Sequence, residues 1–208
     1  LGVGGDYYDF IELPDGKFGI AIGDVSGKGI GASLMMASLQ ASLRGQAIHS
    51  GDDLAMLMTH VNRLVYEAST TNRYATFFYA QFDPNTKKLS YVNAGHNPPF
   101  LIRKHGSVET LEIGGPVIGM LPPMIVSYEM GSIELGVGDM LVGFTDGISE
   151  AMNPLEEEWG EEAMLEELKA LTAKPAVEIL PVIVAAADRF ADGAKQHDDM
   201  TMIVVRVC

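Results

Sequence analysis

Five aspartates stand at the ends of predicted strands or beside glycines, where carboxylates could gather around a cation: Asp6, Asp24, Asp146 and the pair Asp198-Asp199. Carboxylate oxygens are hard ligands, and without an accompanying set of His or Cys they favour Mg²⁺ or Mn²⁺ over zinc. Two such ions about 3.5–4 Å apart can share a carboxylate and turn a bridging water into hydroxide near neutral pH. That hydroxide would attack a phosphorus atom in line, so the chemistry needs no nucleophilic side chain.

Each aspartate taken singly has a simpler explanation. Asp before Gly is a common turn signal, and Asp also caps helices. Spacing alone does not show that these positions converge in space. The residues by themselves therefore leave two interpretations open, a metal centre and a set of unrelated turns.

Hydrophobic periodicity predicts the elements that would position these residues. Residues 17–24 follow a Pro14-Asp15-Gly16 turn and read as the second strand of a hairpin that ends on Asp24. A helix over 32–47 is apolar nearly all round, which predicts burial, and it pairs with a second helix that is capped by Asp52 or Asp53 and runs to about residue 68. An antiparallel meander is predicted from strands at 75–82, 89–93, 99–103 and 108–112. Further strands are predicted at 125–134, 139–144 and 200–207, and a second helix pair at 161–171 and 176–190.

Strands in runs and helices in pairs predict an α+β fold, because a doubly wound parallel sheet would alternate them one for one. Two antiparallel sheets packed face to face, with a helix pair outside each, accommodate this many strands. The chain has 208 residues, 47% of them apolar and 20% charged, which is enough for a sizeable core and excludes disorder. Its length predicts a single domain over residues 1–208, and the lack of an initiator Met suggests excision from a longer protein.

Charge and hydropathy exclude several classes of partner. The 14 basic and 28 acidic residues give a formal net charge of −14, which repels phosphate backbones and anionic lipids, so no nucleic-acid partner is expected. The longest apolar run, 179–187, is interrupted by Pro181 and is shorter than the roughly 20 residues that span a bilayer, so no membrane insertion is expected. Cys208 is the single cysteine, which excludes an intramolecular disulfide and fits a cytoplasmic protein.

Five motifs carry a family resemblance when they are taken in order along the chain. They are Gly4-Gly5-Asp6-Tyr7-Tyr8-Asp9-Phe10, Ile22-Gly23-Asp24-Val25-Ser26-Gly27-Lys28-Gly29, Tyr91-Val92-Asn93-Ala94-Gly95-His96-Asn97-Pro98-Pro99, Phe144-Thr145-Asp146-Gly147-Ile148-Ser149-Glu150-Ala151 and Asp198-Asp199-Met200-Thr201. Together they resemble the SpoIIE/RsbU branch of the PPM (type-2C-like) metal-dependent serine/threonine phosphatases, over essentially the whole chain. The resemblance implies a four-layer α-β-β-α sandwich with two Mn²⁺ or Mg²⁺ ions, and it leaves a third ion undecided.

The resemblance also implies the metal ligands. Asp24 would bridge both ions, the Val25 carbonyl would bind one of them, and Asp146 and Asp198 would complete the other. Asp6 would contact the centre directly or through water. Of the remaining motif residues, Asp199 and Gly147 would lie next to the ligands without touching metal. Asp9 should point to the face opposite Asp6, because side chains alternate along a strand.

Two departures from the family pattern concern the proton donor and the phosphate. Eukaryotic members place a histidine, proposed as general acid, shortly after the bridging aspartate, where Ser26 lies here. Lys28 could bind phosphate or protonate the leaving oxygen, or it could be a solvated lysine in a Gly-rich turn. His96, between Gly95 and Asn97-Pro98, reads as a structural turn residue. The phosphate-gripping arginine of eukaryotic relatives would lie upstream of Asp6.

These features predict a cytoplasmic phosphatase domain that removes phosphate from phosphoserine or phosphothreonine on a protein. By analogy with the branch, the substrate would be a phosphorylated anti-sigma-factor antagonist of the STAS type, and an upstream sensor or regulatory domain, in some cases one that tethers the protein to a membrane, would control the activity. One alternative is a pseudophosphatase, a catalytically silent module of the same fold that only binds its partner. Another is a small-molecule phosphomonoesterase. Retention of Asp24, Asp146 and Asp198 argues against the pseudophosphatase.

Overall fold

The computed structural model describes residues 4–48, 51–69 and 73–208, which form two compact units. Unit 1 consists of Leu1–Pro98 and Leu111–Leu135, and unit 2 of Pro99–Thr110 and Gly136–Cys208. The prediction of a single domain over 1–208 stays a prediction. Among the described residues, no helix combines the length and the apolar character that crossing a bilayer requires.

Unit 1 contains a six-stranded sheet with the order β1-β2-β3-β4-β7, in which β8 also pairs with β4. Neighbouring strands are antiparallel except for β4 and β7, which run parallel. The turn between the first two strands is a short 3₁₀ segment, Pro14–Gly16, as predicted. The strands are β1 Asp6–Glu12, β2 Phe18–Val25, β3 Ala75–Asp83, β4 Lys88–Ala94, β7 Gly114–Gly115 and β8 Gly131–Glu134.

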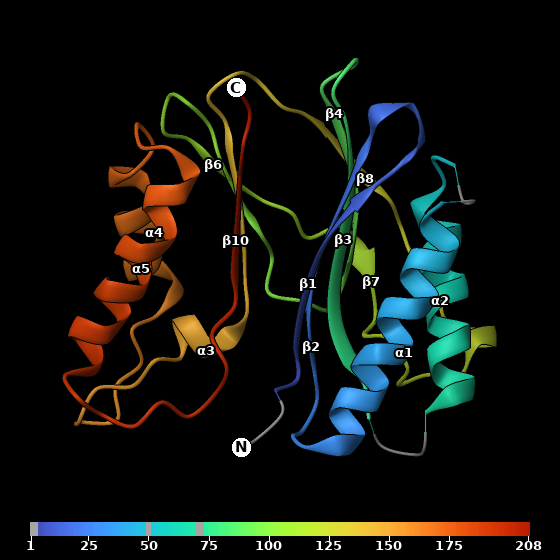
Figure 1. The fold of residues 1–208 in the computed structure, drawn as a ribbon, viewed down its shortest axis with the longest axis horizontal. Helices are drawn as coiled ribbons and strands as arrows, with labels where there is room; N and C mark the ends of the chain where they lie inside the picture. Colours follow the sequence, from blue (N-terminus) through green and yellow to red (C-terminus); the bar gives the residue numbers. More distant parts are fainter. Residues whose placement is uncertain (1–3, 49–50, 70–72) are drawn as a thin grey trace. The chain divides into compact units, whose positions relative to one another are not determined.

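Two helices, α1 (Ile30–Ala47) and α2 (Leu54–Ala68), lie side by side on one face of this sheet (Figure 1). Asp53 caps α2, because its side chain accepts a hydrogen bond from the Met56 N–H at 2.9 Å, and this settles the two predicted capping positions. The prediction that the first helix is buried all round is wrong. One stripe of it enters the core, whereas Ile30 and Leu34 on the opposite side are 76% and 64% exposed.

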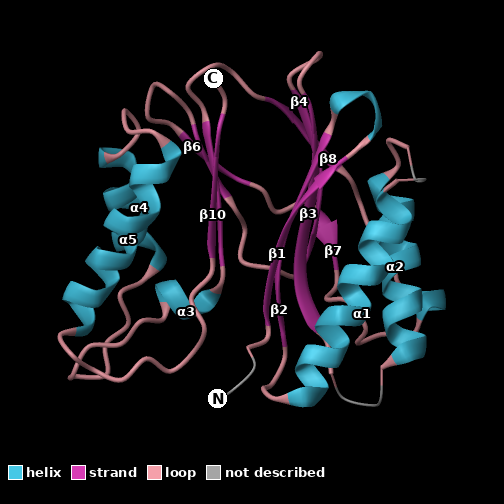
Figure 2. Cartoon of the chain, in the orientation of Figure 1, coloured by secondary structure: helices cyan, strands magenta, loops and turns pink. Residues whose placement is uncertain are grey.

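Unit 2 contains a four-stranded antiparallel sheet with the order β10-β9-β5-β6 and three helices (Figure 2). The strands are β5 Phe100–Ile102, β6 Val108–Thr110, β9 Met140–Phe144 and β10 Met202–Arg206. The helices are α3 Asp146–Ser149, α4 Glu161–Ala170 and α5 Ala176–Ala191. Buried residues of α4 and α5 pack with those of the strands in one apolar cluster, which includes Phe100, Phe144, Met164, Leu168, Ile179 and Ile183.

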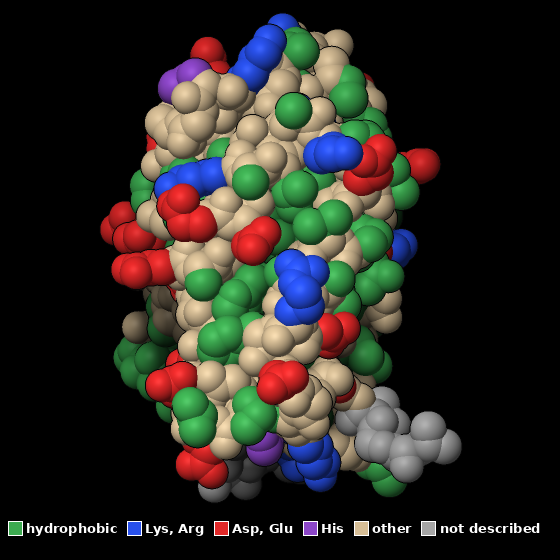
Figure 3. Space-filling model, turned by 90° about the vertical axis from the view of Figure 1, so that its left-hand side faces the viewer, with side chains coloured by type: hydrophobic (Ala, Val, Ile, Leu, Met, Phe, Trp, Pro, Cys, Tyr) green, Lys and Arg blue, Asp and Glu red, His purple; other side chains and the backbone are tan. Residues whose placement is uncertain are grey.

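The outer side of α5 remains apolar in part. Val177 is 81% exposed, and Leu180 and Val184 are 40% and 36% exposed. Figure 3 shows apolar side chains interspersed with acidic and basic ones on this side of unit 2. Acidic neighbours of this kind keep scattered apolar side chains soluble, so the exposure needs no partner to explain it.

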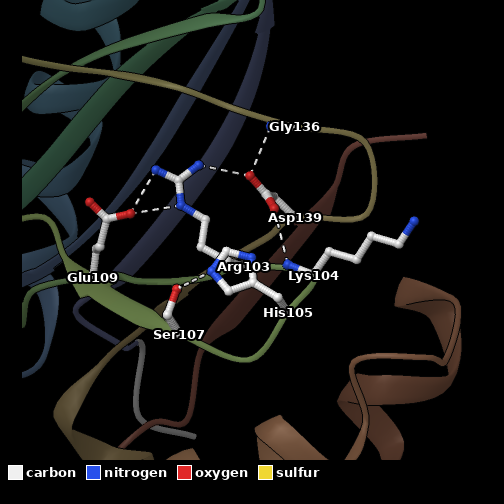
Figure 4. Close-up of polar contacts among 7 residues, drawn as sticks. All are labelled: Arg103, Lys104, His105, Ser107, Glu109, Gly136 and Asp139. Carbon is white, nitrogen blue, oxygen red and sulfur yellow. Dashed lines mark hydrogen bonds and ion pairs between the residues drawn. The ribbon is translucent and has the colours of Figure 1, made fainter.

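Arg103 fixes the end of unit 2 where β5, β6 and β9 meet (Figure 4). Its guanidinium donates to Asp139 at 2.8 Å and to Glu109 at 2.7 Å. Asp139 also accepts from the backbone N–H groups of Gly136 (2.8 Å) and Lys104 (3.1 Å). Burial of Asp139 opposes its charge, but these hydrogen bonds outweigh burial and hold its pKa below the usual 3.8.

Three details of the predicted elements are wrong. The strands at 75–82, 89–93, 99–103 and 108–112 do not form one meander, because the first two belong to the sheet of unit 1 and the last two to that of unit 2. The predicted strand at 125–134 is ordered as a strand only at Gly131–Glu134, and a 3₁₀ turn, Pro123–Ile125, occupies its start. The short elements β7 and α3 were not expected from the sequence.

Candidate metal centre

Asp6 and Asp24 are directly opposite each other in the β1–β2 ladder of unit 1. Opposite residues in an antiparallel pair have Cβ atoms about 4.5–5.5 Å apart on the same face, and like charges there are destabilising. A divalent cation bound by both carboxylates would be attracted by their two negative charges. Both side chains are half-buried, at the end of the sheet where β2 passes into a Gly-rich loop.

Gly5 leaves room for oxygen atoms next to these carboxylates. A Cβ at this position would lie 2.6 Å from the Val25 carbonyl oxygen and 2.8 Å from Asp24 Oδ1, which is closer than real Cβ atoms come. The Gly5 carbonyl in turn accepts the Val25 N–H at 3.2 Å. A carboxylate oxygen and a backbone carbonyl oxygen at one glycine are the donor types that Mg²⁺ and Mn²⁺ prefer, so unit 1 fits the predicted ligands.

The loop after Asp24 is tied to the start of β3. The Ser26 N–H donates to the Tyr74 carbonyl at 2.9 Å, and the Tyr74 N–H donates back to Ser26 Oγ at 3.0 Å. Thr76 Oγ1 reaches the Asp24 carbonyl at 3.5 Å. The Ser26 hydroxyl is therefore engaged with the backbone. Lys28 is exposed two residues further along this loop, and its part in binding phosphate or donating a proton stays a prediction.

In unit 2, Asp146 begins the short helix α3 directly after β9. Thr145, which is fully buried, joins the end of β9 to the segment before β10: its N–H donates to the Thr201 carbonyl at 2.9 Å, and its hydroxyl accepts the Thr201 N–H at 3.0 Å. These bonds hold the segment that carries Asp146 next to the segment that follows Asp198 and Asp199.

Gly147 permits this close approach. A Cβ on Gly147 would lie 1.9 Å from the Asp199 carbonyl oxygen, so no other residue fits here without moving the loop. The Asp199 N–H donates to Asp198 Oδ1 at 2.9 Å, and Gln196 Nε2 donates to the Asp198 carbonyl at 2.7 Å. Asp199 and Gly147 thus adjoin Asp198, and their place beside metal ligands stays a prediction.

Glu150 belongs to the same acidic region and was missed as a site residue, although it stands within the motif that contains Asp146. Its pKa is raised, first by partial burial and then by the negative charges of Asp146, Glu158 and Asp198. A cavity of about 130 Å³ is lined by Gly147, Glu150 and Asp198 among others. The concentration of negative charge in this part of unit 2 suits a cation. The sequence signal for Glu150 was that it is the one other acidic residue in the motif of Asp146.

The predicted ligands are divided between the units: Asp6, Asp24 and Val25 belong to unit 1, and Asp146 and Asp198 to unit 2. In the described ranges, no three His, Cys, Asp or Glu side chains lie close enough together to hold a metal ion. The complete ligand set therefore stays a prediction.

Asp9 and His96 have the structural surroundings that the sequence indicated. Asp9 is buried on the face opposite Asp6, where Arg44 of α1 donates to both of its carboxylate oxygens (2.7 and 2.6 Å) and Tyr7 Oη donates at 2.7 Å. His96 is buried in the turn after β4, and its backbone N–H donates a hydrogen bond to Asn93 Oδ1 at 2.8 Å.

Comparison with known proteins identifies the family. The model of the family Stage II sporulation protein E (SpoIIE) matches residues 14–208. Protein IcfG of Synechocystis sp. is 32% identical over an alignment 233 residues long. The alignment covers 98% of this chain and 36% of IcfG. Phosphoserine phosphatase RsbU of Bacillus subtilis is 30% identical over 205 residues, which cover 97% of this chain and 59% of RsbU. The chain thus spans less than two thirds of either relative.

A solved structure shows the fold. It contains the PP2C phosphatase domain and a fragment of the regulatory domain of the cell fate determinant SpoIIE from Bacillus subtilis, and it superposes with a TM-score of 0.81 at 26% identity. The match covers 98% of this chain and 58% of that one, so the predicted PPM phosphatase fold is confirmed. The chain belongs to the SpoIIE family, and its fold is that of a PP2C-type phosphatase domain.

Proposed function

We propose that this domain hydrolyses phosphoserine or phosphothreonine on a protein with the help of two Mn²⁺ or Mg²⁺ ions. The observation that carries the proposal is the pair of carboxylates Asp6 and Asp24, which are directly opposite in the β1–β2 ladder. They lie beside Gly5, where an added Cβ would be 2.6 Å from the Val25 carbonyl oxygen. Two carboxylates that are opposite in a ladder offer hard oxygen ligands to a divalent cation on one face of the sheet.

The proposed ligands follow the family pattern. Asp24 would hold both ions, the Val25 carbonyl would hold one, and Asp146 and Asp198 would hold the other. Asp6 contacts the centre directly or through water, and a third ion stays open. When bound, the ions supply Lewis acidity and activate water near neutral pH. The proposed ligands suit Mn²⁺ and Mg²⁺ alike, because both ions prefer carboxylate and carbonyl oxygens.

The chain's own residues orient the reaction. Bonds between Ser26 and Tyr74 fix the loop that carries the Val25 carbonyl, and bonds between Thr145 and Thr201 fix the strand end before Asp146. Lys28, which is exposed and cationic, would attract phosphate or give a proton to the leaving oxygen. Ser26 Oγ accepts a hydrogen bond from the Tyr74 N–H. Because an ammonium group is a stronger acid than a hydroxyl, Lys28 would be the better proton donor of the two.

The proposed substrate is a phosphorylated anti-sigma-factor antagonist of the STAS type, in the cytoplasm. The name of RsbU, a phosphoserine phosphatase, supports the phosphoserine part of this proposal. Control by an upstream regulatory or sensor domain is supported by the regulatory domain in the SpoIIE structure and by the greater length of the relatives. The net charge of −14 makes nucleic acid an unfavourable partner.

The second candidate is a pseudophosphatase of the same fold, which binds its partner without turnover. Retention of Asp24, Asp146 and Asp198 in the sequence argues against it. The two candidates differ in a simple property, because only the enzyme hydrolyses a phosphate ester when Mn²⁺ is added.

The test is hydrolysis of p-nitrophenyl phosphate by the domain with Mn²⁺, with Mg²⁺ and after treatment with EDTA. Asp24→Asn and Asp146→Asn should each abolish turnover. Asp15→Asn is the matched control, because Asp15 is exposed in the β1–β2 turn with a left-handed φ of 59° that asparagine tolerates. No turnover with calorimetric Mn²⁺ binding also absent would favour the pseudophosphatase. Binding without turnover would indicate a domain that requires its upstream activator.

A further inference from the structure

Arg73, which lies two residues before β3, extends its side chain over the loop that follows Asp24 in unit 1. Its Nη1 donates to the Ser26 carbonyl at 3.4 Å. A Cβ added to Gly31 would lie 2.7 Å from Nη2, and one added to Gly27 would lie 3.1 Å from Nη1. The absence of side chains at Gly27 and Gly31 therefore makes the space in which the guanidinium lies.

The backbone next to Arg73 is fixed by hydrogen bonds to the same loop. Tyr74, the next residue, exchanges two hydrogen bonds with Ser26, one at 2.9 Å and one at 3.0 Å. Ser26 follows Val25, whose carbonyl is a proposed metal ligand. The guanidinium of Arg73 is consequently held on the carbonyl of the residue adjacent to that ligand.

The charge of Arg73 lacks the carboxylate partner that Arg44, Arg63 and Arg103 have; in the described part of the chain the exposed Arg189 also has none. Arg44 pairs with Asp9, Arg63 with Glu67, and Arg103 with Asp139. Within the described residues, Arg73 makes no ion pair with a carboxylate, although the chain has twice as many acidic residues as basic ones.

Its hydrogen bonding is also incomplete. Arg206, which is likewise without an ion pair among those residues, donates to two backbone carbonyls, those of Thr172 and Lys174. Arg73 has one long bond to one carbonyl, so most of its five N–H donors remain available. A half-buried guanidinium with free donors is suited to an anion, and its planar fork matches the oxygens of a phosphate.

We propose that Arg73 binds the phosphoryl group of the substrate. This inference rests on the proposed function and adds a phosphate-binding residue to it. Arginine keeps its proton at all accessible pH values, so Arg73 acts by attracting the phosphoryl oxygens and does not serve as the general acid. The role is separate from that of Lys28, which could lose or share a proton.

A purely structural role makes a different prediction. If Arg73 only positioned the loop through the Ser26 carbonyl, its removal would disturb the Val25 carbonyl and weaken the binding of Mn²⁺. If Arg73 binds phosphate, its removal leaves Mn²⁺ affinity intact and weakens the binding of phosphate. The two affinities can be measured separately by calorimetry.

The experiment compares the domain with Arg73→Ala, Arg73→Lys and Arg63→Ala. Arg63 is an exposed arginine of α2 paired with Glu67, so it serves as the matched control. Binding of Mn²⁺, and of inorganic phosphate to the Mn²⁺-loaded protein, is followed by calorimetry, and kcat and KM are measured with p-nitrophenyl phosphate. For Arg73→Ala we expect phosphate to bind roughly 10- to 100-fold more weakly, as for a lost charge-assisted hydrogen bond. Arg73→Lys should recover part of this loss, and Arg63→Ala should equal the parent domain.

The outcomes separate this inference from the proposed function. Unchanged phosphate affinity in Arg73→Ala, or a loss of Mn²⁺ affinity in that variant, would overturn the inference even if the parent domain is an active enzyme. A parent domain that binds phosphate through Arg73 without turnover would sink the proposed enzyme and support the inference. A parent domain that binds no phosphate would overturn the inference, whereas turnover by the same protein would still support the enzyme.

Discussion

Asp6 and Asp24 face each other across the β1–β2 ladder, and Gly5 is the residue that keeps space open beside them. We expect Gly5→Ala to weaken Mn²⁺ binding, because the new Cβ would lie 2.6 Å from the Val25 carbonyl oxygen and 2.8 Å from Asp24 Oδ1. Displacing these atoms also strains the end of the sheet, for which overpacking costs of about 1–3 kcal/mol are typical. Calorimetry with Mn²⁺ and urea denaturation measure the two effects.

Gly45→Ala is the control for this substitution. Gly45 lies in the interior of α1, is exposed, and has nothing within 4 Å of an added Cβ. Alanine there should raise the free energy of unfolding by about 0.5–1 kcal/mol, because glycine is a poor helix former. Full Mn²⁺ affinity in Gly5→Ala would show that the Val25 carbonyl and Asp24 are not ligands.

Asp9 makes the stability of unit 1 depend on acid. Burial opposes its charge, but hydrogen bonds from Arg44 and Tyr7 outweigh burial, so its pKa in the folded protein lies below 3.8. A carboxyl with a lowered folded pKa contributes stability that is complete above the unfolded value and is lost as the pH falls through the folded value. Asp9→Asn should therefore lower the urea midpoint at pH 7, and the difference from the parent should shrink below about pH 4.

Glu129→Gln is the matched control for this pH dependence, because Glu129 is exposed on the surface of unit 1. Its urea midpoints should follow those of the parent at every pH. A constant difference between Asp9→Asn and the parent from pH 7 to pH 3 would contradict the assignment of the acid sensitivity to the Asp9–Arg44 contact.

The surroundings of some single residues could be predicted from the sequence, and those of others could not. The face of Asp9 followed from the alternation of side chains along a strand, and His96 followed from its neighbours Gly95 and Asn97. Arg73 could not be predicted, since its contact with Ser26 joins residues 47 positions apart. Glu150 was overlooked for a related reason, because the charges that raise its pKa include one from Asp198.

At the scale of elements, the hydrophobic pattern predicted the strands and long helices well, but not which strands pair. Residues 75–112 alternate like a meander, yet β5 pairs with β9 and leaves the sheet of β3 and β4. Period-2 alternation identifies a half-buried strand and says nothing about its neighbour. The two-residue strand β7 and the one-turn helix α3 are too short to produce a periodic signal.

Helix α5 contains a proline in its interior, and this element should gain stability without it. Pro181 is exposed, lacks an N–H for the carbonyl one turn earlier, and crowds that carbonyl. We expect Pro181→Ala to raise the free energy of unfolding by about 1–2 kcal/mol, the helical gain being reduced by the greater freedom of the unfolded chain. Urea denaturation followed by circular dichroism measures the change.

Val184→Ala serves as the comparison for α5, because Val184 is 36% exposed and its truncation should change the free energy of unfolding by less than about 0.5 kcal/mol. A lower urea midpoint for Pro181→Ala would mean that the proline ring contributes packing that outweighs its missing hydrogen bond.

At the scale of the whole molecule, the proposed ligands come from both units, so metal binding should stabilise the entire chain against unfolding. Ions that bind only the folded state stabilise it by mass action, by about 2.7 kcal/mol at a concentration 100 times the Kd. For a chain of this length that corresponds to a rise in Tm of about 5–10 °C. We expect this rise with Mn²⁺ in the parent domain, and its reversal by EDTA, in differential scanning calorimetry.

The rise should depend on residues from each unit. Asp24→Asn in unit 1 and Asp146→Asn in unit 2 should each abolish most of it, whereas Asp15→Asn should retain it in full. Removing one carboxylate from a site of several lowers metal affinity steeply, because the remaining ligands no longer offset the dehydration of the ion. If Asp24→Asn loses the rise and Asp146→Asn keeps it, the ions are held by unit 1 alone, and the assignment of Asp146 and Asp198 as ligands is wrong.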